Sequence, residues 1–139
     1  MATDADLTVR DIMTRDPIIL GRNDTLDLAE DIMNLRRIRH MPVVDEGSIV
    51  GIVSQRDLFR SALVTALGFG RKTQTAVIKT IKIKEIMTEH VITISPDVSV
   101  KEAARVMIDK KIGCLPVVDG ENLVGLLTET DILRYFAEH

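Results

Sequence analysis

Two copies of one short pattern carry the residues best suited to chemistry in this chain. Gly51–Asp57 and Gly125–Asp131 share the spacing Gly-x-x-(Ser/Thr)-x-x-Asp. In each copy the hydroxyl and the carboxylate fall at the expected start of a helix, where the first backbone N–H groups lack partners within the helix. A carboxylate at such a place can accept two hydrogen bonds from a vicinal diol. The pattern therefore suits the binding of a ribose.

The same spacing also has a purely structural interpretation. Ser54 and Thr128 are good N-cap residues, and Asp57 and Asp131 would favour the positive end of the helix dipole without any ligand. The occurrence of the spacing in both copies supports binding. From the residues alone, both interpretations stay open.

Catalysis finds little support in the sequence. His40, His90 and His139 have no HExxH or other paired-ligand spacing, and no serine lies in a GxSxG motif. The segment 70–73, Gly-Arg-Lys-Thr, lacks the glycine spacing of a phosphate loop and is expected to be a solvated loop. A single cysteine, Cys114, excludes an internal disulfide and predicts a small buried residue. We expect no enzymatic activity, no metal site and no required cofactor.

An internal repeat determines the expected architecture. A shift of 74 residues aligns Val9–Leu63 with Ile83–Ala137 without a gap and gives 15 identities in 55 positions. We predict a first repeat at residues 8–67, a linker at 68–82 and a second repeat at 83–139. One repeat cannot bury both faces of its small sheet alone. The two repeats are therefore expected to pack through their sheets as an α/β module with pseudo-twofold symmetry.

Each repeat is expected to contain a helical turn, a short strand, a helix, a hairpin and a final helix. Short strands are predicted at Ile18–Leu20 and Val91–Ile94, where β-branched residues precede turn signals. Apolar spacing predicts helices at Thr25–Arg37 and Ser99–Lys111. The hairpin strands are predicted at Met41–Val44 with Ile49–Val53, and at Leu115–Val118 with Leu123–Leu127.

Three further features concern glycines and the linker. Gly51 and Gly125 predict a bulge or a place where another group approaches the backbone closely. Residues 62–67 should prolong the final helix of the first repeat as far as Gly68. The segment 74–82 fits either a helical turn or a strand.

Composition excludes several classes of protein. The formal net charge of −3 argues against general nucleic-acid binding, although a local cationic pocket is compatible with it. No apolar run approaches the roughly 20 residues of a membrane helix, and the N-terminus is acidic where a signal peptide would be basic. We expect a cytoplasmic protein with no membrane segment and with an aliphatic core, since only 3% of its residues are aromatic.

The duplicated motifs resemble the cystathionine β-synthase (CBS) domain, which occurs in tandem as the Bateman module. The resemblance rests on Met-Thr at 13–14 and 87–88, Pro-Val-Val-Asp at 42–45 and 116–119, and the Val-Gly-x-x-(Ser/Thr)-x-x-Asp segments. It covers both repeats, 110 of 139 residues. The resemblance implies a regulatory module that binds AMP, ADP, ATP or S-adenosylmethionine in clefts between the repeats.

The resemblance also implies two sets of ligand-binding residues, each centred on one ribose-binding aspartate. The favoured site comprises Pro17, Ile18, Ile19, Ile38, Arg39, His40, Arg56, Leu126, Thr128 and Asp131. The second site comprises Ile52, Ser54, Asp57, His90, Val91, Ile92, Ile112, Gly113, Cys114 and Thr130.

The two implied sites differ in charge. The favoured site has two permanent cations and one titratable donor, Arg39, Arg56 and His40. Uncharged residues stand at these places in the second site, Gly113, Thr130 and Cys114. A well-placed charge-assisted contact to phosphate contributes about 1.5–3 kcal/mol, so we expect phosphorylated adenosine ligands to prefer the Asp131 site.

Three functions are compatible with these expectations. The first is an adenine-nucleotide sensor whose change of conformation is detected by an unknown regulated protein. The second is a ligand-independent interaction module that forms a homodimer through exposed helices, as the resemblance implies. The third is a sensor of S-adenosylmethionine.

Overall fold

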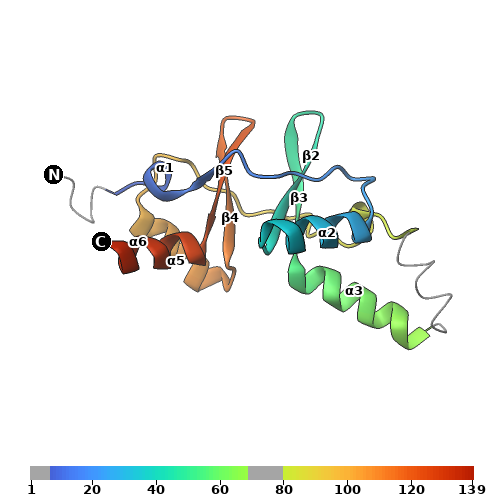
Figure 1. Cartoon of the computed structure of the whole chain (residues 1–139). Helices are drawn as coiled ribbons and strands as arrows, with labels where there is room; N and C mark the ends of the chain where they lie inside the picture. The colour runs from blue at the N-terminus through green and yellow to red at the C-terminus, as the bar shows by residue number, and fades with distance from the viewer. Residues whose placement is uncertain (1–6, 69–79) are drawn as a thin grey trace. The chain divides into compact units, whose positions relative to one another are not determined.

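The computed structural model describes residues 7–68 and 80–139, which fall into two compact units (Figure 1). Of the described residues, unit 1 contains 7–17 and 92–139, and unit 2 contains 18–68 and 80–91. The units differ from the sequence repeats in one respect. The opening segment of each repeat packs in the unit that holds the rest of the other repeat.

Unit 1 is a three-stranded antiparallel sheet with helices. Residues 14–15, from the N-terminal part of the chain, pair with the last strand, at 122–128, which pairs in turn with the strand at 114–119. Its elements are α1 (Val9–Ile12), β1 (Thr14–Arg15), α5 (Val100–Lys110), β4 (Cys114–Asp119), β5 (Asn122–Thr128) and α6 (Glu129–Glu138).

Unit 2 has the equivalent hairpin and helices. Thr88 forms an antiparallel bridge with Ile52, which is the place that β1 takes on the hairpin of unit 1. Its elements are α2 (Leu26–Arg36), β2 (His40–Asp45), β3 (Ser48–Ser54), α3 (Gln55–Gly68) and the 3-10 helix η2 (Ile83–Glu85). Both units combine helices and strands, as the α/β prediction requires.

Each unit has its own aliphatic core. In unit 1, Val9 and Met13 from the opening segment pack with Leu115, Val117 and Leu127 from the hairpin. In unit 2 the corresponding core is built around Leu20, Leu26, Met41, Val43, Val53, Ile83 and Met87. Burial of each such side chain contributes about 1.5–3 kcal/mol, so the opening segments are held in place largely by their apolar residues.

The predicted hairpins are confirmed, and both contain a bulge. The pairing register shifts between Val43 and Val44 in unit 2 and between Val117 and Val118 in unit 1. A Cβ atom on Gly125 would lie 2.8 Å from the backbone oxygen of Thr14. The absence of a side chain at this glycine therefore lets the opening segment approach β5 closely.

The short strands predicted at Ile18–Leu20 and Val91–Ile94 are wrong. Each is reduced to one parallel bridge, Leu20 with Val43 and Ile94 with Val117. The Leu20 N–H donates to the Pro42 carbonyl (2.9 Å). To extend the ladder back to Ile18, residue 42 would have to donate an N–H to the Ile18 carbonyl. Proline has none, so pairing stops after one residue. Pro116 has the same effect beside Ile94.

The helices agree with their predictions, and the linker does so in part. Arg37 and Lys111 adopt left-handed conformations at the C-caps of α2 and α5. Helix α3 extends to Gly68 as expected. The prediction for 74–79 lies outside the described residues. Within 80–82, Thr80 is helical and Lys82 forms an isolated bridge with Thr25. Within residues 7–68 and 80–139, no helix combines the length and apolar character needed to cross a membrane.

Candidate functional site

The Asp131 carboxylate lies in the first turn of α6 and is almost completely buried, with 7% of the residue exposed. Its Oδ2 accepts hydrogen bonds from the backbone N–H of Thr128 (2.9 Å) and from the Thr128 hydroxyl (3.2 Å). The Asp131 N–H in turn donates to the Thr128 hydroxyl oxygen (3.3 Å). This reciprocal pair is a capping box, so the structural interpretation of the spacing is correct for these two residues.

The second oxygen of the same carboxylate has a partner that the sequence did not suggest. The Thr14 hydroxyl donates to Asp131 Oδ1 (3.1 Å). Arg134 adds a longer ion pair to this oxygen (3.8 Å). Thr14 belongs to β1 and lies opposite Leu126 of β5, two residues before Thr128. The repeated Met-Thr opening was the sequence signal that could have pointed to Thr14.

In unit 2 the carboxylate of the corresponding aspartate, Asp57, accepts fewer hydrogen bonds than that of Asp131. The Ser54 N–H donates to Asp57 Oδ2 (2.8 Å), and the Asp57 N–H donates to the Ser54 hydroxyl (3.1 Å). Thr88 occupies the place of Thr14, and its backbone exchanges hydrogen bonds with Ile52 (2.9 and 3.0 Å). Within the described residues of unit 2, no hydrogen bond joins the Thr88 side chain to Asp57.

Cys114 lies beside this cluster in unit 1. It pairs with Thr128 across the hairpin and is buried, as predicted. Burial raises the pKa of the Cys114 thiol to about 12, and the negative charge of Asp131 contributes to this rise. The thiol is therefore protonated at neutral pH and is a poor nucleophile.

Cys114 is expected to resist alkylation by iodoacetamide in the folded protein at about pH 8 and to react in urea. Because the folded pKa is near 12, the alkylation rate should keep rising above pH 9. Asp131→Asn should lower the pKa of Cys114 and speed the reaction. Mass spectrometry can follow the modification, because Cys114 is the single cysteine. Rapid modification of the folded protein at about pH 8 would contradict this description.

The two units divide each predicted set of site residues between them. From the favoured set, unit 1 holds Pro17, Leu126, Thr128 and Asp131, and unit 2 holds Ile18, Ile19, Ile38, Arg39, His40 and Arg56. From the second set, unit 1 holds Ile92, Ile112, Gly113, Cys114 and Thr130, and unit 2 holds Ile52, Ser54, Asp57, His90 and Val91. The assembly of either complete set stays a prediction.

The hairpin ends of the two units differ in charge. In unit 2 the exposed Arg39 accepts a hydrogen bond at its carbonyl from the Gln55 N–H (2.8 Å). In unit 1 the Gly113 carbonyl accepts the equivalent bond from Glu129 (3.1 Å). A Cβ atom on Gly113 would lie 3.0 Å from the Glu129 carboxylate. The start of the hairpin therefore carries the cation Arg39 in unit 2, whereas in unit 1 the Glu129 carboxylate lies beside the equivalent residue, Gly113.

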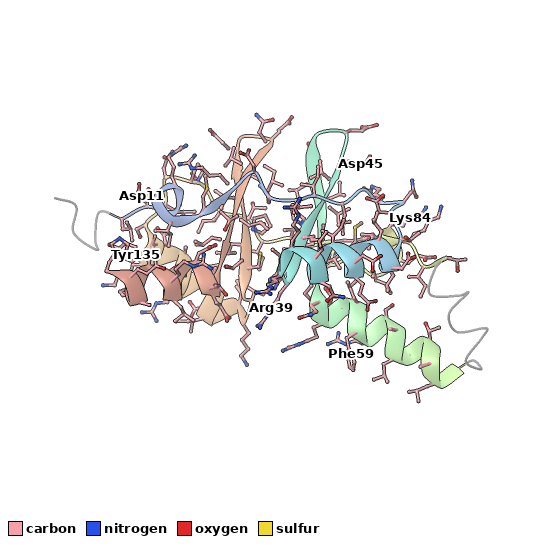
Figure 2. The ribbon with its side chains drawn as sticks, viewed as in Figure 1. Asp11, Arg39, Asp45, Phe59, Lys84 and Tyr135 are labelled. Atoms are coloured by element: carbon pink, nitrogen blue, oxygen red, sulfur yellow. The ribbon has the colours of Figure 1, made fainter. Side chains whose placement is uncertain are left out.

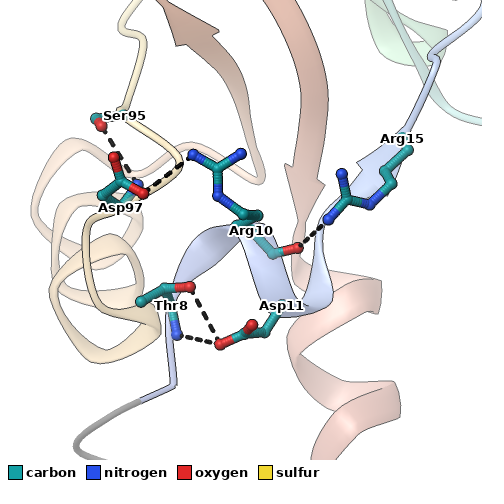
Figure 3. A network of polar contacts seen from close by, with 6 residues as sticks. All are labelled: Thr8, Arg10, Asp11, Arg15, Ser95 and Asp97. Carbon is teal, nitrogen blue, oxygen red and sulfur yellow. Dashed lines mark hydrogen bonds and ion pairs between the residues drawn. The ribbon is translucent and has the colours of Figure 1, made fainter.

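Polar contacts hold the opening segment of unit 1 in place (Figure 3). Asp11 accepts hydrogen bonds from the N–H (2.9 Å) and the hydroxyl (3.1 Å) of Thr8. Arg10 forms an ion pair with Asp97 (3.0 Å), and the Arg15 guanidinium donates to the Arg10 carbonyl (3.2 Å). These exposed contacts add to the apolar packing that holds α1 and β1, the segment that carries Thr14.

Sequence comparison agrees with this duplicated arrangement. The model of the CBS domain matches residues 9–63 and 83–138, which together make up most of the chain. The chain belongs to the CBS domain family. The two matches confirm the pair of CBS repeats that the internal alignment predicted.

Relatives of this CBS pair include proteins of known structure. Protein MJ1225 of Methanocaldococcus jannaschii is 36% identical over 96% of this chain, and this chain spans about half of that relative (49%). CBSX2, solved in complex with AMP, is 25% identical with a TM-score of 0.77, covering 95% of this chain and 97% of CBSX2. The CBS pair of MJ0100, solved with 5′-methylthioadenosine and S-adenosylmethionine, is 31% identical with a TM-score of 0.75, covering 94% of this chain and 96% of that one.

Proposed function

We propose that this CBS pair is a regulatory module that binds an adenosine-containing ligand, with Asp131 accepting a hydrogen bond from a ribose hydroxyl. The observation that carries the proposal is the buried Asp131 carboxylate, whose two oxygens are held by Thr128 and Thr14. The ligands of CBSX2 and MJ0100, which are AMP, 5′-methylthioadenosine and S-adenosylmethionine, all contain an adenosine moiety. A ribose-binding acid suits the part that these ligands share.

We further propose that AMP, ADP or ATP is preferred over S-adenosylmethionine. Arg39 and Arg56 are both exposed in unit 2, which leaves their guanidinium groups available to an anionic ligand. The corresponding hairpin end of unit 1 instead carries Glu129, which would repel phosphate. The difference in charge supports a phosphate contact from Arg39, His40 and Arg56, and it disfavours one near Gly113.

Arg39→Ala is expected to weaken AMP binding by about tenfold or more, because it removes one charge-assisted contact to phosphate. Its effect on adenosine should be small, since adenosine has no phosphate. Arg105→Ala, which removes an exposed arginine of α5, is the control. Isothermal titration calorimetry measures all three proteins with both ligands. Equal affinity of the Arg39 variant and the unsubstituted protein for AMP would contradict this assignment.

A second candidate function is a ligand-independent interaction module that forms a homodimer. Large apolar side chains are exposed on two helices, Phe59, Val64 and Leu67 on α3 and Leu133 and Phe136 on α6. Phe59 projects outward from α3 (Figure 2). Exposed apolar side chains of this size support a protein interface on these helices.

Thermal unfolding with added nucleotide distinguishes the two functions. A ligand present at 100 times its dissociation constant should stabilise the native state by about 2.7 kcal/mol. A ligand-independent module should show no stabilisation by AMP, ADP, ATP or S-adenosylmethionine. Mass spectrometry of any small molecule released from the purified protein would identify which adenosine ligand is bound.

A further inference from the structure

We infer that Thr14 is a positioning residue for the Asp131 carboxylate and thereby strengthens its hydrogen bond to a ribose hydroxyl. This inference rests on the proposed function. The hydrogen bond from Thr14 to Asp131 Oδ1 joins residues 117 positions apart in the sequence. Thr14 is expected to act through Asp131 and without touching the ligand itself.

Hydrogen bonds to both oxygens hold the carboxylate in one orientation more tightly than bonds to a single oxygen. Thr128 restrains Oδ2 through its N–H and its hydroxyl. The terminal torsion of an aspartate is broad, and because the carboxylate is planar, each hydrogen bond to either oxygen narrows that torsion. The bond from Thr14 supplies the second restraint, because it comes from a different strand.

The hydrogen-bonding capacity of Asp131 also limits what the ligand can reach. An ionised carboxylate offers about four acceptor positions. Three are filled by Thr128 and Thr14, and Arg134 lies at 3.8 Å from Oδ1, beyond hydrogen-bond distance. The remaining position is on Oδ1, the oxygen that Thr14 orients. Ribose binding at this oxygen should therefore depend on Thr14.

The backbone of Thr14 is itself well restrained. Met13 is buried in the core of unit 1, and Thr14 pairs with Leu126 in the sheet. The Thr14 carbonyl comes so close to Gly125 that any side chain there would clash with it. The Thr14 hydroxyl is thus presented to Asp131 by the fold of unit 1.

Unit 2 provides a natural comparison. Thr88 has the same residue type, follows the same Met and bridges Ile52 as Thr14 bridges Leu126. In the described part of that unit, however, the Asp57 carboxylate accepts one hydrogen bond, from the backbone N–H of Ser54. The Thr88 hydroxyl is therefore expected to have no positioning role.

Isothermal titration calorimetry with AMP and with 2′,3′-dideoxy-AMP tests the inference. Thr14→Val keeps the shape of the side chain and removes the donor. It should weaken AMP binding by about tenfold, the effect of losing about 1.4 kcal/mol. The affinity for the dideoxy analogue should be unchanged, because that ligand has no ribose hydroxyl to present to Asp131. Thr14→Ser should retain AMP affinity, and Thr88→Val should change it by less than about twofold.

Three outcomes would overturn the inference. The first is unchanged AMP affinity in Thr14→Val when the unsubstituted protein discriminates AMP from the dideoxy analogue. The second is an equal loss for both ligands, which would indicate a general structural effect. The third is no AMP binding by the unsubstituted protein, which would overturn the proposed function as well. If Thr14→Val fails to fold, the comparison of Thr14→Ser with Thr14→Ala replaces it, with the same expected difference between the two ligands.

Discussion

Asp131→Asn is expected to weaken AMP binding by about 100-fold. The substitution keeps the size of the side chain but removes its charge, and hydrogen bonds to a charged acceptor contribute about 1.5–3 kcal/mol each. Loss of about 3 kcal/mol of binding free energy corresponds to roughly a 100-fold rise in the dissociation constant. Isothermal titration calorimetry measures this change directly.

Asp57→Asn is the matched control for the same experiment. It changes the same atoms in the equivalent helix of unit 2, but Asp57 belongs to the predicted site that lacks cations. We expect AMP affinity to change by less than about threefold. Equal losses in the two variants would contradict the preference for Asp131. Thermal unfolding of both proteins without ligand verifies that each remains folded.

Leu127→Ala is expected to lower the free energy of unfolding by about 3 kcal/mol. Leu127 is fully buried in β5 and packs in the core of unit 1. Its truncation loses transfer free energy and leaves a cavity, and such changes cost about 2.7–5 kcal/mol in well-packed cores. Urea denaturation monitored by circular dichroism measures the change.

Leu133→Ala provides the comparison for this core substitution. Leu133 lies on α6, and 67% of it is exposed. Its truncation should change the free energy of unfolding by no more than about 0.5 kcal/mol. A loss at Leu133 as large as that at Leu127 would show either that α6 is covered in solution or that the core is wrongly placed.

Much of the fold could be predicted because the sequence contains it twice. The aligned Pro-Val-Val-Asp strands and the glycines Gly51 and Gly125 predicted both hairpins and their irregularities correctly. The short strands at Ile18–Leu20 and Val91–Ile94 were overpredicted, because β-branched composition indicates only that a segment itself favours the extended conformation. Pairing also needs a donor on the partner strand, and Pro42 and Pro116 lack it.

The exchange of opening segments between units could not be predicted. The apolar residues Val9 and Met13 would suit either sheet, since the two hairpins present nearly the same surface to them. An alignment of repeats gives the order of elements but not which sheet edge each opening segment joins. Thr14 was missed for this reason, because its contact with Asp131 exists only after the exchange.

The candidate site was predictable in its local part. The spacing of Thr128 and Asp131 predicted their capping geometry, and the apolar run around Cys114 predicted its burial. Contacts that combine residues from both units, such as those expected of Arg39 and His40, depend on tertiary arrangement and stay predictions. The spacing of residues along the chain predicts hydrogen bonds within one helical turn, but it does not predict contacts between residues far apart in the sequence.

Calorimetric titration of the unsubstituted protein with AMP tests the central claim most directly. We predict saturable binding that competes with ATP and that is lost or greatly weakened in Asp131→Asn. The absence of binding heat and of thermal stabilisation with AMP, ADP, ATP and S-adenosylmethionine, each at about 1 mM, well above typical ligand dissociation constants, would contradict it.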